Sequence, residues 1–418
     1  MIRAIYSLVV WVMQPFVRRK ARSRAALEPM YGEHVNERFG DYDAYVANES
    51  RSLIWIHAVS LGETRAAAIL LKELRHVIPN MRLLLTNGTA TGRVEGFKLL
   101  QKDDVQVWQP WDTQGATQQF FAHFKPHLGV LLETEVWPNL IASAQVASVP
   151  VLLVNARMSE KSLKKTLRLK WLANEAYHGL TQIYAQTQDD ALRLERIGAR
   201  VDGVFGNLKF DITPNLEQLV KAQTMRSPLN KPVILFASSR EGEEENFLNA
   251  LQALPVKARA SAHWLIVPRH PQRFDEVANL ILAAGFAVSR RGHWPIDGTD
   301  DSIWLGDSLG EMTFYGGLAS AALLGGSFEK LGGQNLIEML ACGCPVVMGP
   351  HTFNFDEAAT LAEAASVAFR VETLESAIQR SLGLCTADGF ERSAASNFVA
   401  KHRGAAVKTA TAIQKLLV

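Results

Sequence analysis

The sequence predicts an α/β protein with two doubly wound domains that face a central cleft. Short apolar segments alternate with segments of helical periodicity along most of the chain, which is the pattern of repeated β-α-β units. The alternation stops once, at a polar segment that contains Pro214 and Pro228, and then starts again. The length of 418 residues suits two or three domains. We therefore expect two parallel sheets with helices on both faces.

The first domain is expected to span residues 25–213, and the linker residues 214–230. Apolar runs of strand length recur in the first domain between segments of helical periodicity. The expected strands are 52–59, 81–87, 105–110, 127–134, 149–156, 182–187 and 201–207.

The second domain is expected to span residues 231–418. Its expected strands are 231–239, 263–269, 287–291, 302–306, 320–326 and 344–349. The last segment, residues 390–417, has a helical pattern and no strand after it. This final helix is a candidate for packing back on the first domain.

A short N-terminal membrane-anchor helix is expected within residues 1–24. Residues 4–17 form an apolar run that is shorter than the about 20 residues of a spanning helix. The main basic cluster follows this run, whereas a signal peptide carries its charge in front. The cluster consists of Arg18, Arg19, Lys20, Arg22 and Arg24. A spanning helix, a helix lying on the membrane surface and an amphipathic helix packed on the domain all remain open.

Composition argues against several classes of function. The formal net charge of +2 is too small to indicate a nucleic-acid partner. Cys342, Cys344 and Cys385 are too few for a disulfide framework and indicate a reducing compartment. The chain has no phosphate-loop lysine-serine signature. Neither a cofactor nor a bound metal is expected.

Polar residues follow the expected strands of the first domain. Glu63 has Ser60 three residues before it, which is the spacing of a helix capping box. The pattern favours the cap, and a general base is the alternative. Glu133 and Glu135 lie at the end of a strand, where alternation predicts that only one of them faces the cleft. Lys209 lies near the linker and is a candidate for binding an anionic carboxylate, although its pattern alone is that of an ordinary lysine.

The second domain has a candidate anion site in the sequence VPRHPQRF (267–274). Arg269, His270 and Arg273 gather directly after an expected strand. Arginine binds phosphate or carboxylate through two parallel hydrogen bonds, and histidine can donate to either group. This cluster favours anion binding over an ordinary polar loop.

A glycine-rich segment in residues 324–350 reads as strand, loop, helix and strand. Its glycines permit a close approach of the backbone, and the helix N-terminus offers free amides to a phosphate. Glu338 in the first helical turn is a candidate for accepting hydrogen bonds from ribose hydroxyls. The spacing of Asn335 and Glu338 also fits a capping box, but the two glycine pairs favour nucleotide binding. The loop at residues 306–312 offers Glu311 and backbone amides.

Taken together, these motifs resemble the Kdo (3-deoxy-D-manno-octulosonic acid) transferase family. The resemblance runs in order from about residue 55 to residue 356. It rests on HAVSLGE, ETEVWPNLI, NARMS, GNLKFD, EGEEE, VPRHPQRF, GDSLGEM, GGQNLIE and GPHTFNF.

The resemblance implies a GT-B fold and transfer of Kdo from CMP-Kdo to the lipid A precursor with inversion and without a required metal. It also implies lipopolysaccharide biosynthesis at the cytoplasmic side of a Gram-negative inner membrane. The partners would be CMP-Kdo, the lipid A precursor and the anionic lipids of that membrane.

The resemblance also implies roles for particular residues. Glu63 becomes the general base, and Glu133 and Lys209 become stabilisers of the charged transition state. The CMP site would comprise Arg269, His270, Gly310, Glu311, Met312, Asn335, Leu336, Ile337 and Glu338.

This chain departs from the family pattern in two places. TNGTATG (86–92) replaces a more threonine-rich stretch, and Arg240 stands where the family often has histidine. Two rival functions remain: a GT-B enzyme that uses a UDP-sugar on a lipid acceptor, and a non-catalytic nucleotide-binding protein of the membrane surface. The number of Kdo residues transferred, the acylation of the acceptor and the oligomeric state are open.

Overall fold

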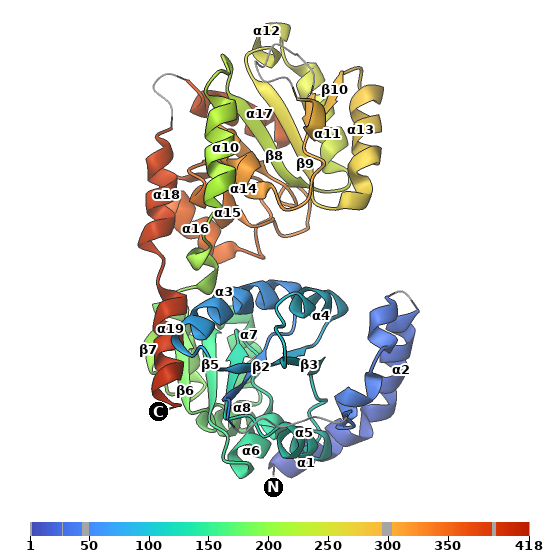
Figure 1. Ribbon diagram of the computed structural model, residues 1–418, viewed down its shortest axis with the longest axis vertical. Helices are drawn as coiled ribbons and strands as arrows, with labels where there is room; N and C mark the ends of the chain where they lie inside the picture. Colours follow the sequence, from blue (N-terminus) through green and yellow to red (C-terminus); the bar gives the residue numbers. More distant parts are fainter. Residues whose placement is uncertain (1, 27, 44–49, 295–302, 387–389, 418) are drawn as a thin grey trace. The chain divides into compact units, whose positions relative to one another are not determined.

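The computed structural model describes residues 2–26, 28–43, 50–294, 303–386 and 390–417. These residues form two compact units, which Figure 1 shows as separate α/β assemblies. Unit 1 comprises Met1–Asp211 and Arg403–Val418, and unit 2 comprises Ile212–His402. Each unit contains one seven-stranded sheet whose strands are all parallel. The prediction of two doubly wound α/β domains is confirmed.

The sheet of unit 1 has the strand order β3-β2-β1-β4-β5-β6-β7. Its strands are short, and the side chains of the central ones are buried, as expected for strands covered on both faces. The strands are β1 Leu53–His57, β2 Arg82–Asn87, β3 Val105–Trp108, β4 Leu128–Leu132, β5 Val151–Ala156, β6 Gln182–Ala185 and β7 Gly203–Val204.

Helices cover both faces of this sheet (Figure 1). Helices α3 and α19 pack on one face, and α5, α6 and α9 pack on the other. The helices of unit 1 are α1 Ile2–Val12, α2 Gln14–Ala25, α3 Leu61–Val77, α4 Ala90–Phe97, α5 Gln114–Phe124, α6 Pro138–Val146, α7 Glu160–Leu167, α8 Lys170–His178, α9 Gln188–Arg196 and α19 Ala405–Lys415, with 3-10 turns η1 Pro29–Gly32, η2 Val35–Phe39 and η3 Leu208–Asp211.

The sheet of unit 2 has the strand order β10-β11-β9-β8-β12-β13-β14. The strands are β8 Val233–Ser239, β9 His263–Pro268, β10 Val288–Arg290, β11 Ile303–Leu305, β12 Ala321–Leu324, β13 Val346–Met348 and β14 Ala368–Arg370. The helices are α10 Leu216–Arg226, α11 Glu243–Ala253, α12 Val256–Arg259, α13 Phe274–Ala283, α14 Met312–Leu318, α15 Leu336–Ala341, α16 Asp356–Ala364, α17 Leu374–Leu384 and α18 Arg392–Lys401, with 3-10 turns η4 Pro271–Arg273 and η5 Arg291–His293.

The structure differs from the expected linker over residues 214–230. Most of this segment is helix α10, which begins at the N-cap Asn215. Gln218 fastens α10 within unit 2, because its side chain donates to the Gly310 carbonyl over 2.8 Å and accepts from the Phe314 amide over 3.2 Å. The prolines of this segment flank the helix and leave its hydrogen bonds intact.

The chain passes from unit 2 back to unit 1 before its last helix. The Asp211 carboxylate accepts hydrogen bonds from the amides of Gly404 and Ala406, the latter over 2.6 Å, at the N-terminus of α19. Ala410 and Ile413 of α19 are fully buried in the cluster that also contains α3. Residues 403–418 therefore belong to unit 1, whereas the expected second domain ran to the end of the chain.

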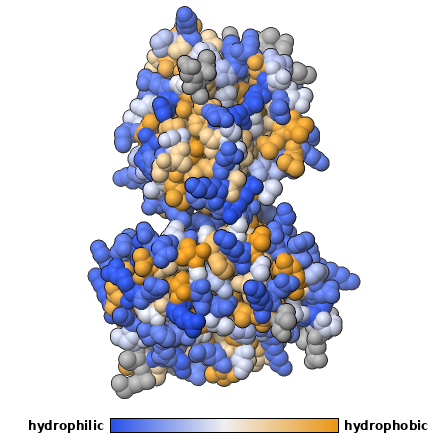
Figure 2. Space-filling view, turned by 90° about the vertical axis from the view of Figure 1, so that its left-hand side faces the viewer, coloured by the Kyte–Doolittle hydropathy of each residue, from blue (hydrophilic) through white to orange (hydrophobic). Residues whose placement is uncertain are grey.

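The N-terminal segment, expected to be a short anchor helix, forms α1 and α2, which are 11 and 12 residues long. Among the described residues, no helix has both the length and the apolar character needed to cross a membrane. On the face drawn in Figure 2, hydrophilic and hydrophobic side chains are interspersed over both units.

Asp211→Ala should lower the free energy of unfolding by about 1–2 kcal/mol, because two amides at the start of α19 lose their carboxylate partner. Urea unfolding followed by circular dichroism measures the change. Asp189→Ala is the control, since Asp189 is an exposed carboxylate in the first turn of α9. Equal stability of the two variants would contradict the prediction.

Candidate active site

Each sheet has a position at which its strand order reverses, and ligands of such sheets bind beyond the carboxyl ends of the strands there. In unit 1 this position lies between β1 and β4. Glu63 follows β1 and Glu133 follows β4. The two candidate carboxylates thus belong to the connections on either side of the reversal.

Glu63 is held by the capping box that its spacing predicts. Ser60 is the N-cap of α3, and its hydroxyl both accepts from the Glu63 amide and donates to Glu63 Oε1 over 2.8 Å. Glu63 Oε2 accepts from the Val59 amide over 2.9 Å. Each carboxylate oxygen keeps a further lone pair, so the cap does not exhaust its capacity to accept a proton.

The surroundings of Glu63 favour its protonated form. Burial raises the pKa of its carboxyl to about 7, against the opposing effect of the hydrogen bonds from Val59 and Ser60. The charges of Glu133 and Glu135 contribute further to the rise. A carboxyl that titrates near neutral pH has the affinity for protons that a general base requires.

Glu133 is the centre of a group of charges. Its side chain is 12% exposed and lies 3.3 Å from Arg157 Nε and 3.7 Å from Lys209 Nζ. The Glu133 backbone has a φ of 59°, a left-handed conformation that costs energy in a residue other than glycine. The structure therefore brings the predicted residues Glu133 and Lys209 together and adds Arg157 to them.

The expectation that strand alternation separates Glu133 and Glu135 is wrong, because β4 ends at Leu132 and neither glutamate lies in the strand. The Glu135 carboxylate accepts from Trp137 Nε1 over 2.9 Å. Its pKa is raised, mainly by burial. Both carboxylates act on the pKa of Glu63.

In unit 2 the strand order reverses between β8 and β12. Arg240 follows β8, and Arg269 and His270 follow the neighbouring β9. The pKa of His270 is lowered by its partial burial and then by the positive charges of Arg240 and Arg269. The structure thus gathers three cationic or hydrogen-bonding side chains at this edge. Such a group suits an anion.

Arg273 does not belong to this anion site, contrary to the sequence prediction. Its side chain is 4% exposed and donates to Glu244 over 2.8 Å and to Glu276 over 2.9 Å. These carboxylates occupy the guanidinium, so Arg273 holds α11 and α13 together.

The glycine-rich loop is built differently from a phosphate loop. The buried Glu243 carboxylate accepts from the amides of Gly326, over 2.7 Å, and Phe328, over 3.2 Å. A side chain at Gly325 would lie 2.2 Å from the Ser238 carbonyl. The glycines therefore permit close packing on the end of β8, and Glu243 uses two amides of the loop.

The segment from Asn335 to Glu338 forms the start of α15. Asn335 caps the helix through a hydrogen bond from the Ile337 amide to its side chain over 3.1 Å. Leu336 and Ile337 have fully buried side chains, so only their main chain is available to a ligand. Glu338 is half-buried.

The segment from Gly310 to Met312 forms the start of α14. Gly310 has a φ of 78°, and Met312 is the first residue of the helix. The Glu311 carboxylate is paired with Arg291 over 3.0 and 3.2 Å and also accepts from Ser308. Its pKa is lowered, although its partial burial alone would raise it. A ligand that contacts the Glu311 carboxylate must therefore share it with Arg291 and Ser308.

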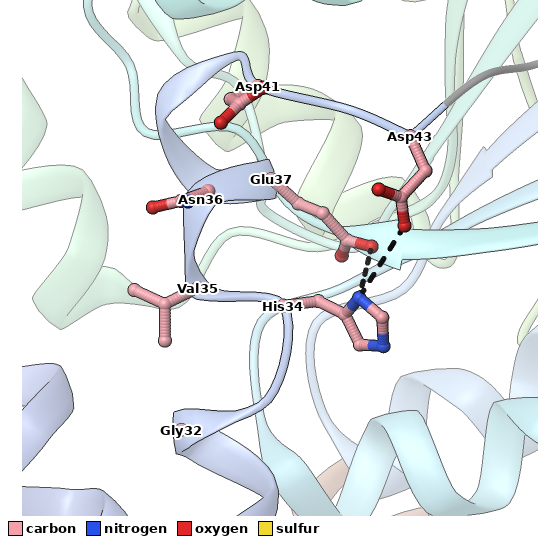
Figure 3. A pocket seen from close by; sticks show the side chains of 7 residues that line it. All are labelled: Gly32, His34, Val35, Asn36, Glu37, Asp41 and Asp43. Atoms are coloured by element: carbon pink, nitrogen blue, oxygen red, sulfur yellow. Dashed lines mark ion pairs between the residues drawn. The ribbon is translucent and has the colours of Figure 1, made fainter.

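A cavity of about 390 Å³, which none of these residues lines, lies in the η1–η2 segment (Figure 3). His34 points toward Glu37 and Asp43, and its Nδ1 atom lies 3.8 and 3.9 Å from them. The cavity carries acidic side chains, which do not suit a phosphorylated ligand. In the described part of the chain, no group of three or more His, Cys, Asp or Glu side chains could hold a metal ion.

Sequence reasoning undervalued three residues of these edges. In the sequence, Arg157 and Glu243 stood out only as parts of the motifs NARMS and EGEEE, and Arg240 only as a departure from the family pattern. Arg240 Nε is buried and has no hydrogen-bond partner among the described residues. The position of Arg240 directly after β8 was the signal that could have identified it.

The free energy of unfolding should report the raised pKa of Glu63. An unfolded glutamate titrates near about 4.3. The protonated carboxyl favours the fold, so this contribution is complete below that pH and is lost as the pH rises through about 7. Relative to Glu63→Gln, the native protein should lose up to about 3 kcal/mol between pH 4.5 and 8. Urea unfolding at several pH values measures this difference, and a constant difference would contradict the prediction.

The chain is similar to curated transferases over nearly its full length. A family model described as 3-deoxy-D-manno-octulosonic-acid transferase (kdotransferase) matches residues 33–212. A 3-deoxy-D-manno-octulosonic acid transferase of Bordetella pertussis is 40% identical over 99% of both chains. One of Haemophilus influenzae is 31% identical over 91% of this chain and 90% of the relative.

Solved structures share the fold. A glycosyltransferase from Rickettsia africae covers 90% of this chain and 99% of its own, with a TM-score of 0.55 and 14% identity. A UDP-GlcNAc 2-epimerase from Neisseria meningitidis covers 88% and 99%, with a TM-score of 0.54 and 15% identity. At these identities the likeness shows the two-domain GT-B fold alone. Together with the relatives of high coverage, the motifs identify the chain as a member of the Kdo transferase family.

Proposed function

We propose that this protein transfers Kdo from CMP-Kdo to the lipid A precursor, lipid IVA, with inversion, in lipopolysaccharide core biosynthesis. The membership in the Kdo transferase family supports the sugar and the reaction class. The observation that carries the mechanism is Glu63, a carboxyl whose pKa is raised to about 7 at the strand-order reversal of unit 1.

Glu63 acts as the general base. Its carboxylate takes the proton of an acceptor hydroxyl as the hydroxyl oxygen forms a bond to the anomeric carbon of Kdo. The bond from that carbon to the CMP phosphate breaks, and CMP leaves with the bonding electrons. Positive charge develops on the sugar in this step, as in other glycosyl transfers.

The charges around Glu133 can act on the sugar that is transferred. Lys209 and Arg157 flank the Glu133 carboxylate at 3.7 and 3.3 Å. The carboxylate can stabilise the developing positive charge, while the two cations can attract the carboxylate of Kdo. A strained backbone at Glu133 that persists in the fold fits a positioned functional group.

Unit 2 binds the donor. Arg240, Arg269 and His270 can neutralise the phosphate of CMP without a metal. Glu338 accepts from the ribose hydroxyls, and the main chain at Met312 and at Leu336 adds backbone amides. The proposed lipid acceptor and the basic cluster of α2 support the proposal that transfer takes place at the cytoplasmic side of the inner membrane.

Glu63→Gln should lower kcat for Kdo transfer at least about 100-fold, because the acceptor proton loses its base. The assay combines CMP-Kdo with purified lipid IVA in detergent and identifies products by mass. Glu195→Gln, an exposed carboxylate of α9, is the matched control. The native pH profile of kcat/KM should rise through about 7.

Full activity of the folded Glu63→Gln protein would refute its role as the base. Binding of CMP without any transfer would favour a nucleotide-binding protein of the membrane surface. Competition by UDP in place of CMP would favour a transferase that uses a UDP-sugar.

Arg269→Ala should weaken CMP binding about 10- to 100-fold, the effect of losing a hydrogen bond to a charged group. Isothermal titration with CMP measures the dissociation constant, and Arg380→Ala on the exposed side of α17 is the control. An unchanged constant would remove Arg269 from the donor site.

A further inference from the structure

Helix α1 packs on unit 1 with a narrow face that carries Tyr6, Ser7 and Val10. Val10 and the half-buried Tyr6 and Ser7 face the unit, whereas Ile5, Leu8 and Trp11 are 58%, 61% and 62% exposed. A surface helix of a soluble domain shows the opposite arrangement, with its apolar face toward the core. The exposed face of α1 therefore suits an apolar environment.

Specific hydrogen bonds hold α1 in this orientation. Tyr6 donates to the buried Asp112 carboxylate over 2.7 Å, and Ser7 donates to the Asn139 side chain over 2.8 Å. Asp112 also accepts from the amides of Asn139 and Leu140 at the start of α6. The helix is thus fastened to the domain, and its apolar side chains have a defined direction relative to unit 1.

A second exposed surface lies at residues 161–171, which we name the α7–α8 corner. It holds five cations and no acidic residue, and all five cations are exposed. Leu169 and Trp171 are 52% and 48% exposed in the same stretch. No ion pair to these cations occurs among the described residues. The cations are Lys161, Lys164, Lys165, Arg168 and Lys170.

Helix α8, which begins in the corner, contacts α1 through an ion pair. Arg3 of α1 is paired with Glu175 of α8 over 3.0 Å. Trp171 precedes Glu175 by four residues on the same helix, so the two side chains share a face one turn apart. Trp171 at the start of α8 therefore lies about one helical turn from a contact with α1, although about 160 residues separate the two helices in the chain.

We propose that the α7–α8 corner is a second membrane contact of unit 1 and binds an anionic bilayer surface beside α1. A solvated basic face would explain the lysines but not the exposed Leu169 and Trp171 among them. Basic side chains interleaved with an exposed tryptophan suit the interface of an anionic membrane. This inference rests on the proposed lipid acceptor and extends it. A second contact beside that of α1 would limit the rotation of unit 1 about the axis of α1 on the bilayer.

Flotation of the full chain with vesicles tests the corner. The vesicles contain phosphatidylglycerol and phosphatidylcholine, or phosphatidylcholine alone. In the corner variant, four exposed cations become glutamate, and partition onto the anionic vesicles should fall at least about tenfold. The control variant carries the same change of charge elsewhere on the surface. The corner variant is K164E/K165E/R168E/K170E, and the control variant is K72E/K102E/K257E/K401E.

Trp171→Ser separates the apolar contribution from the charge and should weaken binding to both kinds of vesicle. Equal flotation of the corner and control variants would overturn the proposal. Kdo transfer to acceptor dispersed in detergent is measured in parallel and should be unchanged in the corner variant. Loss of transfer there would instead place the acceptor on the corner and overturn the membrane contact. Loss of flotation of the corner variant with intact Kdo transfer supports the proposed membrane contact.

Discussion

Neighbouring strands at the centre of the unit 1 sheet send their connections to opposite faces, and the candidate site depends on this constraint. β1 continues into α3 on one face, and β4 continues into α6 on the other. The first residues of both connections therefore lie at the carboxyl-terminal edge of the sheet, and a crevice can form between the two connections. Glu63 and Glu133 occupy these starts. In unit 2 the same constraint places Arg240 at the end of β8, opposite the glycine-rich loop after β12.

The capping box shows how a structural role and a chemical role can belong to one side chain. Ser60 and the Val59 amide hold the Glu63 carboxyl in one orientation. Burial then acts against these hydrogen bonds and keeps the proton affinity high. A cap in solvent would be ionised throughout the physiological range, so the desolvation separates this glutamate from an ordinary helix cap.

Much of the architecture could be predicted from the sequence, because buried parallel strands and amphipathic helices have distinct periods. β14 was not predicted, since Arg370 interrupts the short apolar run at residues 367–371. The linker was expected at residues 214–230 because prolines lie on both sides of this segment, but the segment forms helix α10 of unit 2. Three features could not be predicted because they depend on contacts between segments that are distant in the sequence. Arg273 is paired with Glu244, Glu243 accepts from amides of the glycine-rich loop, and the backbone of Glu133 is left-handed. A single sequence without its fold does not contain them.

The return of the chain to unit 1 after His402 has a consequence for biosynthesis. Unit 2 is a continuous insertion and can fold as soon as it leaves the ribosome. The face of the unit 1 sheet that carries α3 stays partly uncovered until residues 405–415 have been made, because α19 supplies part of that core. The first unit to be synthesised is therefore the last to be completed, and part of its apolar core stays uncovered until α19 has been made.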